Sequence, residues 1–154
     1  MGLRNHGIAD SFTRTGINDD ENNMYSFELC RKYQEAINRG NLEQALTLFA
    51  DEATVNAPLT GQSSARKFHE WLLGTTKETI TRLKHVFQSL DSSGALAMQL
   101  HYTWVLSNGK TLEFEGVMIF EFTADRMSIC KLTIIYDTEP IRTHVSQSAL
   151  AAIR

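Results

Sequence analysis

The stretch "KYQEAINRGNLEQALTLFADEATVNAP", residues 32–58, contains two helix patterns and one strand pattern in direct succession. Apolar residues recur at helical spacing before Gly40, which stands where a helix C-terminus often takes a left-handed residue. Asn41 then begins a second helix, with Gln44 three residues further on in the manner of a capping box. The segment "DEATVNAP" alternates as a strand does and stops at Pro58. We therefore predict a helix, a second helix and a strand.

The rest of the chain adds one more helix and then only strands. Ser63 or Ser64 can cap a helix that runs through Leu73, and Asn108-Gly109 is a strong hairpin signal. Alternating segments are expected to form strands near residues 80–90, 95–107, 111–123 and 127–138. Helices followed by a meander of long strands predict an α+β fold. In this fold a curved, mostly antiparallel β-sheet wraps three N-terminal helices and leaves a conical cavity between them.

Length and composition indicate one domain with flanking segments. A chain of 154 residues, 42% of them hydrophobic, can fill one core but not two. Residues 1–23 are polar and end in "NDDENN", so we expect a flexible N-terminal arm that buries little. The domain is expected to span residues 24–143, and residues 144–154 are expected to form a C-terminal tail.

Charge and cysteine usage exclude several other classes of protein. The net charge of −3 offers no basic surface for nucleic acid, because that binding depends on clustered Lys and Arg. The two cysteines, Cys30 and Cys130, lack metal-binding spacing, and we expect neither a metal nor a cofactor. No apolar run could span a bilayer and no signal peptide is visible, so we expect no membrane association and a cytoplasmic location.

The strand expected at residues 95–107 has two different faces. One face is large and apolar and consists of Leu96, Met98, Leu100, Tyr102, Trp104 and Leu106; the other is smaller and more polar and consists of Ala97, Gln99, His101, Thr103 and Val105. A sheet with apolar residues on both sides usually packs helices on one side and a second subunit on the other. Periodicity alone leaves open which face points inward.

Three segments carry a resemblance to a known family. The stretch at 32–58, "GVMIFEFTADRM" (116–127) and "LTIIYDTEPIR" (132–142) resemble the nuclear transport factor 2-like superfamily, in its ketosteroid isomerase and SnoaL-like polyketide cyclase branch. The resemblance covers about residues 24–143 and implies a cone-shaped, cystatin-like fold. It implies no single reaction, because this cone hosts isomerases, cyclases, epoxide hydrolases, dehydratases and non-catalytic binders.

The acidic residues of the characterised members do not carry over. The position of the isomerases' catalytic aspartate is Ala57, and the position of their oxyanion-stabilising aspartate is Met118, where SnoaL-like cyclases also place an acid. The essential carboxylate of limonene epoxide hydrolases falls at Ile134, whereas Asn56 matches their water-binding asparagine. Proton abstraction requires a base within reach of the substrate. Neither the isomerase nor the epoxide hydrolase activity is therefore implied.

The resemblance also orients the sheet and assigns a pocket. The catalytic candidates are Tyr33 and His101. The ligand-binding candidates are Asn56, Phe68, His69, Leu72, Gln99, Thr103, Met118, Phe120, Ile134 and Tyr136. The opposite face of the sheet is expected to form a homodimer interface, with Leu100, Tyr102 and Trp104 near its centre.

The candidate catalytic residues also have structural interpretations. His101 could be a core histidine that hydrogen-bonds Thr103 or Tyr33. His69 could pair with Tyr33, whose hydroxyl needs a partner if it is buried. Three functions stay open: a hydrophobic pocket for a small apolar or aromatic molecule, an enzyme of isomerase, cyclase or dehydratase type that uses Tyr33 and His101, and a non-catalytic dimerisation module. The missing acids favour binding.

Overall fold

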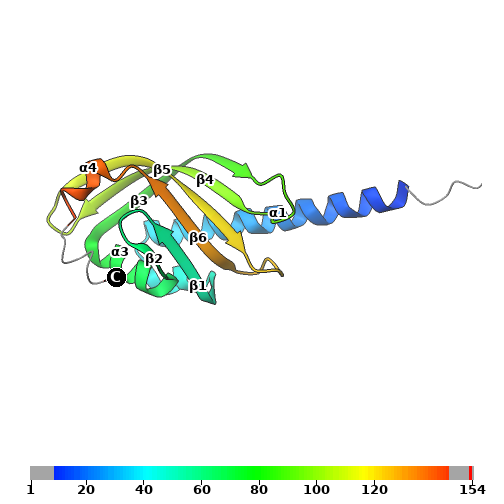
Figure 1. Ribbon diagram of the computed structural model, residues 1–154, viewed down its shortest axis with the longest axis horizontal. Helices are drawn as coiled ribbons and strands as arrows, with labels where there is room; N and C mark the ends of the chain where they lie inside the picture. The colour runs from blue at the N-terminus through cyan, green and yellow to red at the C-terminus, as the bar shows by residue number, and fades with distance from the viewer. Residues whose placement is uncertain (1–8, 146–152, 154) are drawn as a thin grey trace, which may run out of the picture.

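The computed structural model describes residues 9–145 and 153, and of residues 9–19 it describes only the backbone. Within this part of the chain the elements are α1 (Ala9–Asn38), α2 (Leu42–Leu46), β1 (Phe49–Ala57), β2 (Gly61–Ser64), α3 (Ala65–Thr75), β3 (Thr76–Gln88), β4 (Leu96–Leu106), β5 (Thr111–Phe122), β6 (Ile129–Tyr136) and α4 (Glu139–Arg142). Figure 1 shows α1 running behind the sheet and projecting well beyond it.

The described strands form one six-stranded sheet in the order β2-β1-β6-β5-β4-β3. Neighbouring strands are antiparallel except β1 and β6, which are parallel. Helix α1 packs against β3, and α3 packs against β1 and β3, so the helices cover one face of the curved sheet (Figure 1). We call this the inner face and the opposite one the outer face. The predicted α+β fold, with N-terminal helices wrapped by a mostly antiparallel sheet, is confirmed.

The helix ends follow the sequence signals. Gly40 follows α1 with a φ of 65°, a left-handed conformation that glycine adopts without steric cost. Asn41 caps α2, because its side-chain oxygen accepts a hydrogen bond from the backbone N–H of Gln44 at 3.1 Å. Ser64 caps α3 in the same way through the N–H of Lys67 at 3.2 Å. These two caps fix the starts of the helices before and after the β1–β2 hairpin.

Two segments differ from expectation. Helix α1 begins at Ala9, so residues 9–23, expected to be a flexible arm, continue the helix. A polar segment can extend a helix that is already packed, because propagation avoids the cost of nucleation. Residues 61–64, where no strand was expected, form β2 because the turn before them folds the chain back onto β1. The remainder of the expected arm (1–8) and most of the expected tail (146–152 and 154) lie outside the described residues.

Strand β4 alternates between the two faces along its whole length. Its buried row is Leu96, Met98, Leu100, Tyr102, Trp104 and Leu106, and its half-buried row is Ala97, Gln99, His101, Thr103 and Val105. The buried row lies in the core on the inner face, where Leu100 is 0%, Tyr102 2% and Trp104 4% exposed. The prediction that these three residues form a homodimer interface is therefore wrong, because the chain's own core covers them.

The hairpin between β4 and β5 explains this orientation. Its register pairs Thr103 with Glu113 and His101 with Glu115, and residues paired across strands lie on the same face. Glu113 and Glu115 are exposed, as is Glu121 further along β5. Burying such carboxylates without partners would be costly, so the glutamate row points to solvent. The row of Thr103 and His101 points outward with it, and the large apolar row of β4 faces the helices.

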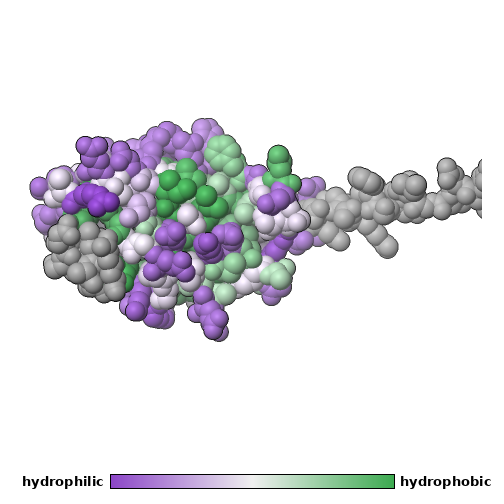
Figure 2. Space-filling model, viewed as in Figure 1, coloured by the Kyte–Doolittle hydropathy of each residue, from purple (hydrophilic) through white to green (hydrophobic). Residues whose placement is uncertain are grey.

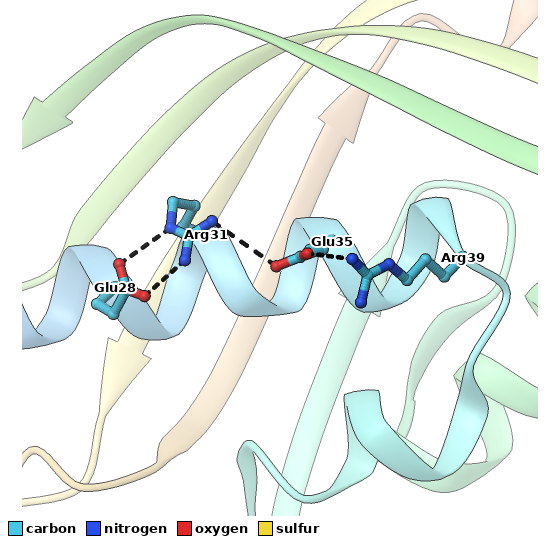
Figure 3. A network of polar contacts seen from close by, with 4 residues as sticks. All are labelled: Glu28, Arg31, Glu35 and Arg39. Carbon is cyan, nitrogen blue, oxygen red and sulfur yellow. Dashed lines mark hydrogen bonds and ion pairs between the residues drawn. The ribbon is translucent and has the colours of Figure 1, made fainter.

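The side of α1 that is exposed to solvent carries a ladder of charges. Arg31 contacts Glu28 at 2.7 Å and Glu35 at 3.7 Å, and Arg39 contacts Glu35 at 2.6 Å. Figure 3 shows these four side chains in one line along the helix. Exposed pairs at this spacing contribute only about 0.3–0.5 kcal/mol each. Their main effect is to keep this side of α1 in water while the apolar side packs on the sheet.

Candidate functional site

The inner face of the sheet and the helices that cover it enclose an interior rich in aromatic rings. Tyr102 stacks on Phe114 with ring centroids 4.9 Å apart, and Trp104 meets Phe114 edge-on at 4.9 Å. Tyr136 lies 5.1 Å from Phe114 and 6.0 Å from Trp104. The buried and partly buried rings on this side of the sheet are called the aromatic interior, and they are Tyr33, Phe49, Phe68, His69, Trp71, Tyr102, Trp104, Phe114, Phe120 and Tyr136.

A glycine in β5 makes room for two of these rings. A Cβ atom on Gly116 would lie 2.8 Å from the backbone oxygen of Ile135 and 3.0 Å from the ring of Tyr102. It would also lie 3.2 Å from the Cβ of Tyr136. The absence of a side chain at Gly116 therefore allows Tyr102 and Tyr136 to sit where they do.

Tyr33 of α1 and His69 of α3 form a buried hydrogen-bonded pair. The Tyr33 hydroxyl lies 2.8 Å from His69 Nε2, and His69 Nδ1 lies 2.6 Å from the backbone oxygen of Ala65. A carbonyl oxygen only accepts hydrogen bonds, so Nδ1 must carry the hydrogen and donate it to Ala65. Nε2 of the neutral ring is then an acceptor, and the Tyr33 hydroxyl donates to it.

Burial keeps both members of this pair uncharged. Burial lowers the pKa of His69 to about 4, with a smaller opposing effect from its bond to the Ala65 carbonyl. Burial also raises the pKa of the Tyr33 hydroxyl well above its usual value. At neutral pH the pair is therefore a neutral imidazole that accepts a hydrogen bond from a neutral phenol.

Three hydrogen-bond donors of the aromatic interior have no partner among the described residues. They are Nε1 of Trp71, the hydroxyl of Tyr102 and Nε1 of Trp104. Each residue is at least nine-tenths buried. Leaving a buried donor unpaired costs about 1–3 kcal/mol. The interior therefore presents hydrogen-bond donors that its own side chains do not satisfy.

The structure divides the predicted site residues between the two faces of the sheet. Those in the aromatic interior or its apolar wall are Tyr33, Phe68, His69, Leu72, Met118, Phe120, Ile134 and Tyr136. Those on the outer face are Asn56, Gln99, His101 and Thr103. Placing the second group in the pocket was wrong, because the register that pairs Met118 with Met98 puts Gln99 and His101 on the other side.

The outer-face residues have surroundings of their own. His101 Nε2 lies 3.6 Å from a carboxylate oxygen of Glu113, and Gln99 contacts His85 at 3.0 Å. Asn56 is exposed at the pairing of β1 with β2. Because the sheet separates His101 from Tyr33, these two residues cannot act together on one ligand, and the suggested enzyme that uses both is not supported.

Sequence reasoning missed Tyr102, Trp104 and Trp71 as parts of the interior. It had assigned Tyr102 and Trp104 to a subunit interface and had given Trp71 no place in the pocket. The glutamates of β5 are the signal that could have placed Tyr102 and Trp104, because the hairpin register sets those residues opposite to the glutamate row. For Trp71, the signal is its spacing of three residues from Phe68, which puts both on the same side of α3.

Two hollows open near the aromatic interior. One of about 390 Å³ lies against Trp71 and is also lined by Lys67, Glu70 and Ile153. Another, of about 320 Å³, lies beside the β4–β5 turn and is lined by Gly74, Thr75, Leu106, Ser107, Asn108, His144 and Val145. Within the described part of the chain, Trp71 is the one residue of the aromatic interior that also lines either hollow.

Two further observations concern the described residues alone. Within residues 9–145 and 153, no three His, Cys, Asp or Glu side chains gather in a way that could hold a metal ion. In the same part of the chain, no helix is both long and apolar enough to cross a membrane.

Comparison with known proteins identifies the domain type. The sequence model of the SnoaL-like domain matches residues 30–128. A search of curated proteins finds no match to the sequence.

Several solved structures share the fold at low sequence identity. PrhC from Penicillium brasilianum superposes with a TM-score of 0.69 at 14% identity, over 86% of this chain and 94% of that one. An NTF2-like protein of unknown function from Burkholderia pseudomallei gives a TM-score of 0.65 at 15% identity, over 79% and 98% of the chains. TerC, co-crystallized with polyporic acid, gives 0.63 at 10% identity, over 77% and 96%. These similarities confirm the NTF2-like, cystatin-like fold and do not identify a reaction.

Proposed function

The chain belongs to the SnoaL-like domain family, and we propose that it binds a small, flat, uncharged and largely apolar molecule in its aromatic interior. The observation that carries the proposal is the pair of buried donors at Tyr102 and Trp104, which lack partners among the described residues. A ligand with hydrogen-bond acceptors would satisfy both. TerC shares the fold and was co-crystallized with polyporic acid, which supports the idea that this fold accommodates a small organic molecule.

The chemistry of the lining determines the class of ligand. Aromatic rings such as Phe114 and Tyr136 favour a flat molecule, because rings gain most from stacked or edge-on contacts. The donors at Trp71, Tyr102 and Trp104 favour carbonyl or ether oxygens. No charged side chain belongs to the aromatic interior, so a charged ligand would lose its hydration without compensation. We therefore expect an aromatic ketone or a similar neutral compound.

Binding is measured with a ketone and a matched hydrocarbon. Acetophenone and ethylbenzene are titrated by calorimetry or by the fluorescence of the tryptophans. We expect the ketone to bind about tenfold more tightly, the size of one net hydrogen bond. Tyr102→Phe is expected to weaken the binding of the ketone and leave that of the hydrocarbon unchanged.

Two control variants make this test specific. Tyr25→Phe removes a hydroxyl from an exposed tyrosine of α1, and His101→Phe alters the outer face; both should bind acetophenone as the parent does. If neither compound binds, or if His101→Phe weakens binding as strongly as Tyr102→Phe does, the proposed site is wrong. Native mass spectrometry of the freshly purified protein provides an independent test for a retained small molecule.

The Tyr33–His69 pair favours one second candidate, an enzyme of isomerase, cyclase or dehydratase type that moves a proton through Tyr33. In such an enzyme His69 would receive the proton. With a pKa of about 4, only roughly one His69 in a thousand holds a proton at pH 7. A general base works best when its pKa lies near the working pH. Binding without turnover is therefore the better supported function. Catalytic turnover that is lost in Tyr33→Phe would instead favour the enzyme.

We also propose that the chain forms a homodimer through the outer face of the sheet. Figure 2 views the molecule with α1 behind the sheet and shows an apolar patch over β5 and β6, surrounded by hydrophilic side chains. We define the outer patch as Val117, Ile119 and Ile135, which the register of β5 and β6 places on this face. Ile135 is 53% exposed. These residues replace Leu100, Tyr102 and Trp104 as the expected centre of the interface.

A further inference from the structure

Among the polar groups of the aromatic interior, Tyr33 differs from the others in the direction of its hydroxyl hydrogen. His69 Nδ1 is committed to the backbone oxygen of Ala65 at 2.6 Å, and this leaves Nε2 as an acceptor only. Nε2 lies 2.8 Å from the Tyr33 oxygen and takes its hydrogen. The lone pairs of the Tyr33 oxygen are then the part of this hydroxyl that remains for other partners.

We propose that His69 is a positioning residue that holds Tyr33 as a hydrogen-bond acceptor toward the ligand, so that the site selects a molecule bearing a hydroxyl group as well as a carbonyl. This inference rests on the proposed function, because it concerns a ligand of the same interior. According to this inference the ligand carries a hydrogen-bond donor. The unpaired groups of Tyr102 and Trp104 require only that the ligand carry acceptors.

The arrangement of the phenols supports this division of roles. Tyr102 has the phenols of Tyr33 and Tyr136 as electrostatic neighbours: burial raises the pKa of Tyr102, and these two hydroxyls raise it further. The Tyr102 hydroxyl nevertheless has no hydrogen-bond partner among the described residues. A ligand that contacts both hydroxyls would accept a hydrogen bond from Tyr102 and donate one to Tyr33.

The position of Tyr33 is too constrained for it to exchange these roles. Its ring contacts Phe49 and Phe120 edge-on, both at 5.6 Å, and the residue is 1% exposed. If the tautomer of His69 reversed, the bare Nδ1 would face the lone pairs of the Ala65 oxygen without a hydrogen between them. Such a buried, unsatisfied contact is costly. The backbone oxygen of Ala65 in α3 therefore determines that the hydroxyl of Tyr33 in α1 donates its hydrogen to His69.

The test compares three ketones that differ at one position of the ring. Acetophenone has a carbonyl alone, para-hydroxyacetophenone adds a donor, and para-methoxyacetophenone adds an oxygen that can only accept. Affinities are measured by calorimetry at a mildly acidic pH at which the phenol is neutral. We expect the hydroxy compound to bind about tenfold more tightly than the methoxy compound, because its hydroxyl can donate to Tyr33.

Variants at His69 separate positioning from a merely structural role. In His69→Leu the Tyr33 hydroxyl is free to donate, so we expect the preference to reverse toward the methoxy compound. In His69→Gln an amide oxygen can accept from Tyr33, and the preference for the hydroxy compound should return. Tyr33→Phe should remove the preference in either direction. His85→Leu, which changes an exposed histidine of the outer face, serves as the matched control and should behave as the parent.

Each outcome gives a decision. If none of the three ketones binds, the proposed function fails and this inference fails with it. If they bind but the hydroxy compound shows no advantage, or if His69→Leu keeps the advantage, only the role of His69 is overturned. Should His69→Leu not fold, nitrogen NMR of His69 in the parent protein decides the matter. A hydrogen on Nδ1 supports the inference, and a hydrogen on Nε2 overturns it.

Discussion

Tyr33 and His69 show how one backbone carbonyl determines the chemistry of two side chains. The Ala65 oxygen accepts from Nδ1 of His69, and this single contact makes the imidazole an acceptor toward Tyr33. The pair is satisfied internally, whereas Tyr102 and Trp104 are not. The interior therefore contains a few polar groups surrounded by apolar side chains. Their contribution to stability depends on which of them have hydrogen-bond partners.

Acid should destabilise the protein through His69. The pKa of its imidazole is about 4 in the folded chain, below the usual value of about 6.5 in an unfolded one. Between those values the unfolded chain binds the proton and the folded chain does not. The free energy of unfolding therefore falls as pH decreases from 6.5 to 4, by up to about 3 kcal/mol in total.

The variant His69→Gln isolates this contribution from that of the carboxylates. Urea unfolding of the parent and the variant is followed across the same pH range. We expect the slope against pH to be smaller in the variant by up to about 1.4 kcal/mol per pH unit. Equal slopes in the two proteins would contradict the assignment of a depressed pKa to His69.

Gly116→Ala should damage the aromatic interior. The added Cβ would lie 2.8 Å from a backbone oxygen of β6, and backbone in the centre of a sheet cannot move aside easily. Overpacking of this kind costs about 1–3 kcal/mol. Gly74→Ala is the matched control, because a Cβ there meets nothing within 4 Å. Thermal unfolding should show a loss for Gly116→Ala and little change for Gly74→Ala; a tolerated Gly116→Ala would contradict the packing described for Tyr102 and Tyr136.

At the scale of elements, the sequence predicts what depends on local chemistry. The helix stop at Gly40 and the start at Asn41 are confirmed, because their hydrogen bonds close within a few residues. The hairpin at Asn108-Gly109 is confirmed for the same reason. Likewise, residues of α1 and α3 predicted for the pocket do lie inside, since an amphipathic helix offers only one apolar side to a core.

The orientation of β4 was not predictable from the strand alone. Both of its rows could be buried, one by helices and the other by a second subunit, and a shift of one residue exchanges them. The charges of β5 contain the missing information, but only when they are combined with the hairpin register, which pairs Thr103 with Glu113. Trp71 follows Phe68 by three residues and its ring lies 6.1 Å from that of Phe68, so helical spacing could have placed it inside.

Two polar side chains of α1 contact the same residue of β3. Gln34 donates a hydrogen bond to the Thr81 carbonyl at 3.1 Å, and Asn38 makes the remaining bonds. Asn38 accepts hydrogen bonds from the N–H and the hydroxyl of Thr81 at 2.7 and 2.9 Å, and it donates to the Thr81 carbonyl at 3.1 Å. Strand β3 is at the edge of the sheet, so these backbone groups have no strand partner on that side. Asn38 therefore both attaches the helix and satisfies an exposed edge.

Asn38→Ala should loosen this attachment. Loss of three partly exposed hydrogen bonds is expected to lower the free energy of unfolding by about 1–2 kcal/mol. Arg39→Ala changes the adjacent residue, whose ion pair with Glu35 is exposed, and should cost at most about 0.5 kcal/mol. Denaturant unfolding measures both values. Hydrogen exchange should in addition show faster exchange at Thr81 in Asn38→Ala; equal stability in the two variants would mean that Asn38 does not hold α1 to the edge.

At the scale of the whole molecule, the two solvent-facing sides differ in character. The helix side presents the ladder of Arg31, Glu35 and their neighbours, which is well hydrated and offers little to a partner (Figure 3). The outer face of the sheet instead combines the outer patch with surrounding hydrophilic side chains (Figure 2), some of which form ion pairs. An example of such a pair is Lys84 with Glu115. Association through an apolar centre with a polar rim is the common anatomy of protein interfaces.

Ile135→Lys should convert the proposed dimer to a monomer. The side chain is 53% exposed in the single chain, so the substitution removes little from the core, yet in a dimer the lysine would be buried near the centre of the interface. Met127→Lys is the matched control, because Met127 is 57% exposed in the turn between β5 and β6, away from the outer patch. Analytical ultracentrifugation should give a dimer for the parent and for Met127→Lys and a monomer for Ile135→Lys, with the unfolding temperature of the isolated chain unchanged. A parent protein that sediments as a monomer would refute the interface. A dimer that survives Ile135→Lys would place the interface on another surface of the protein.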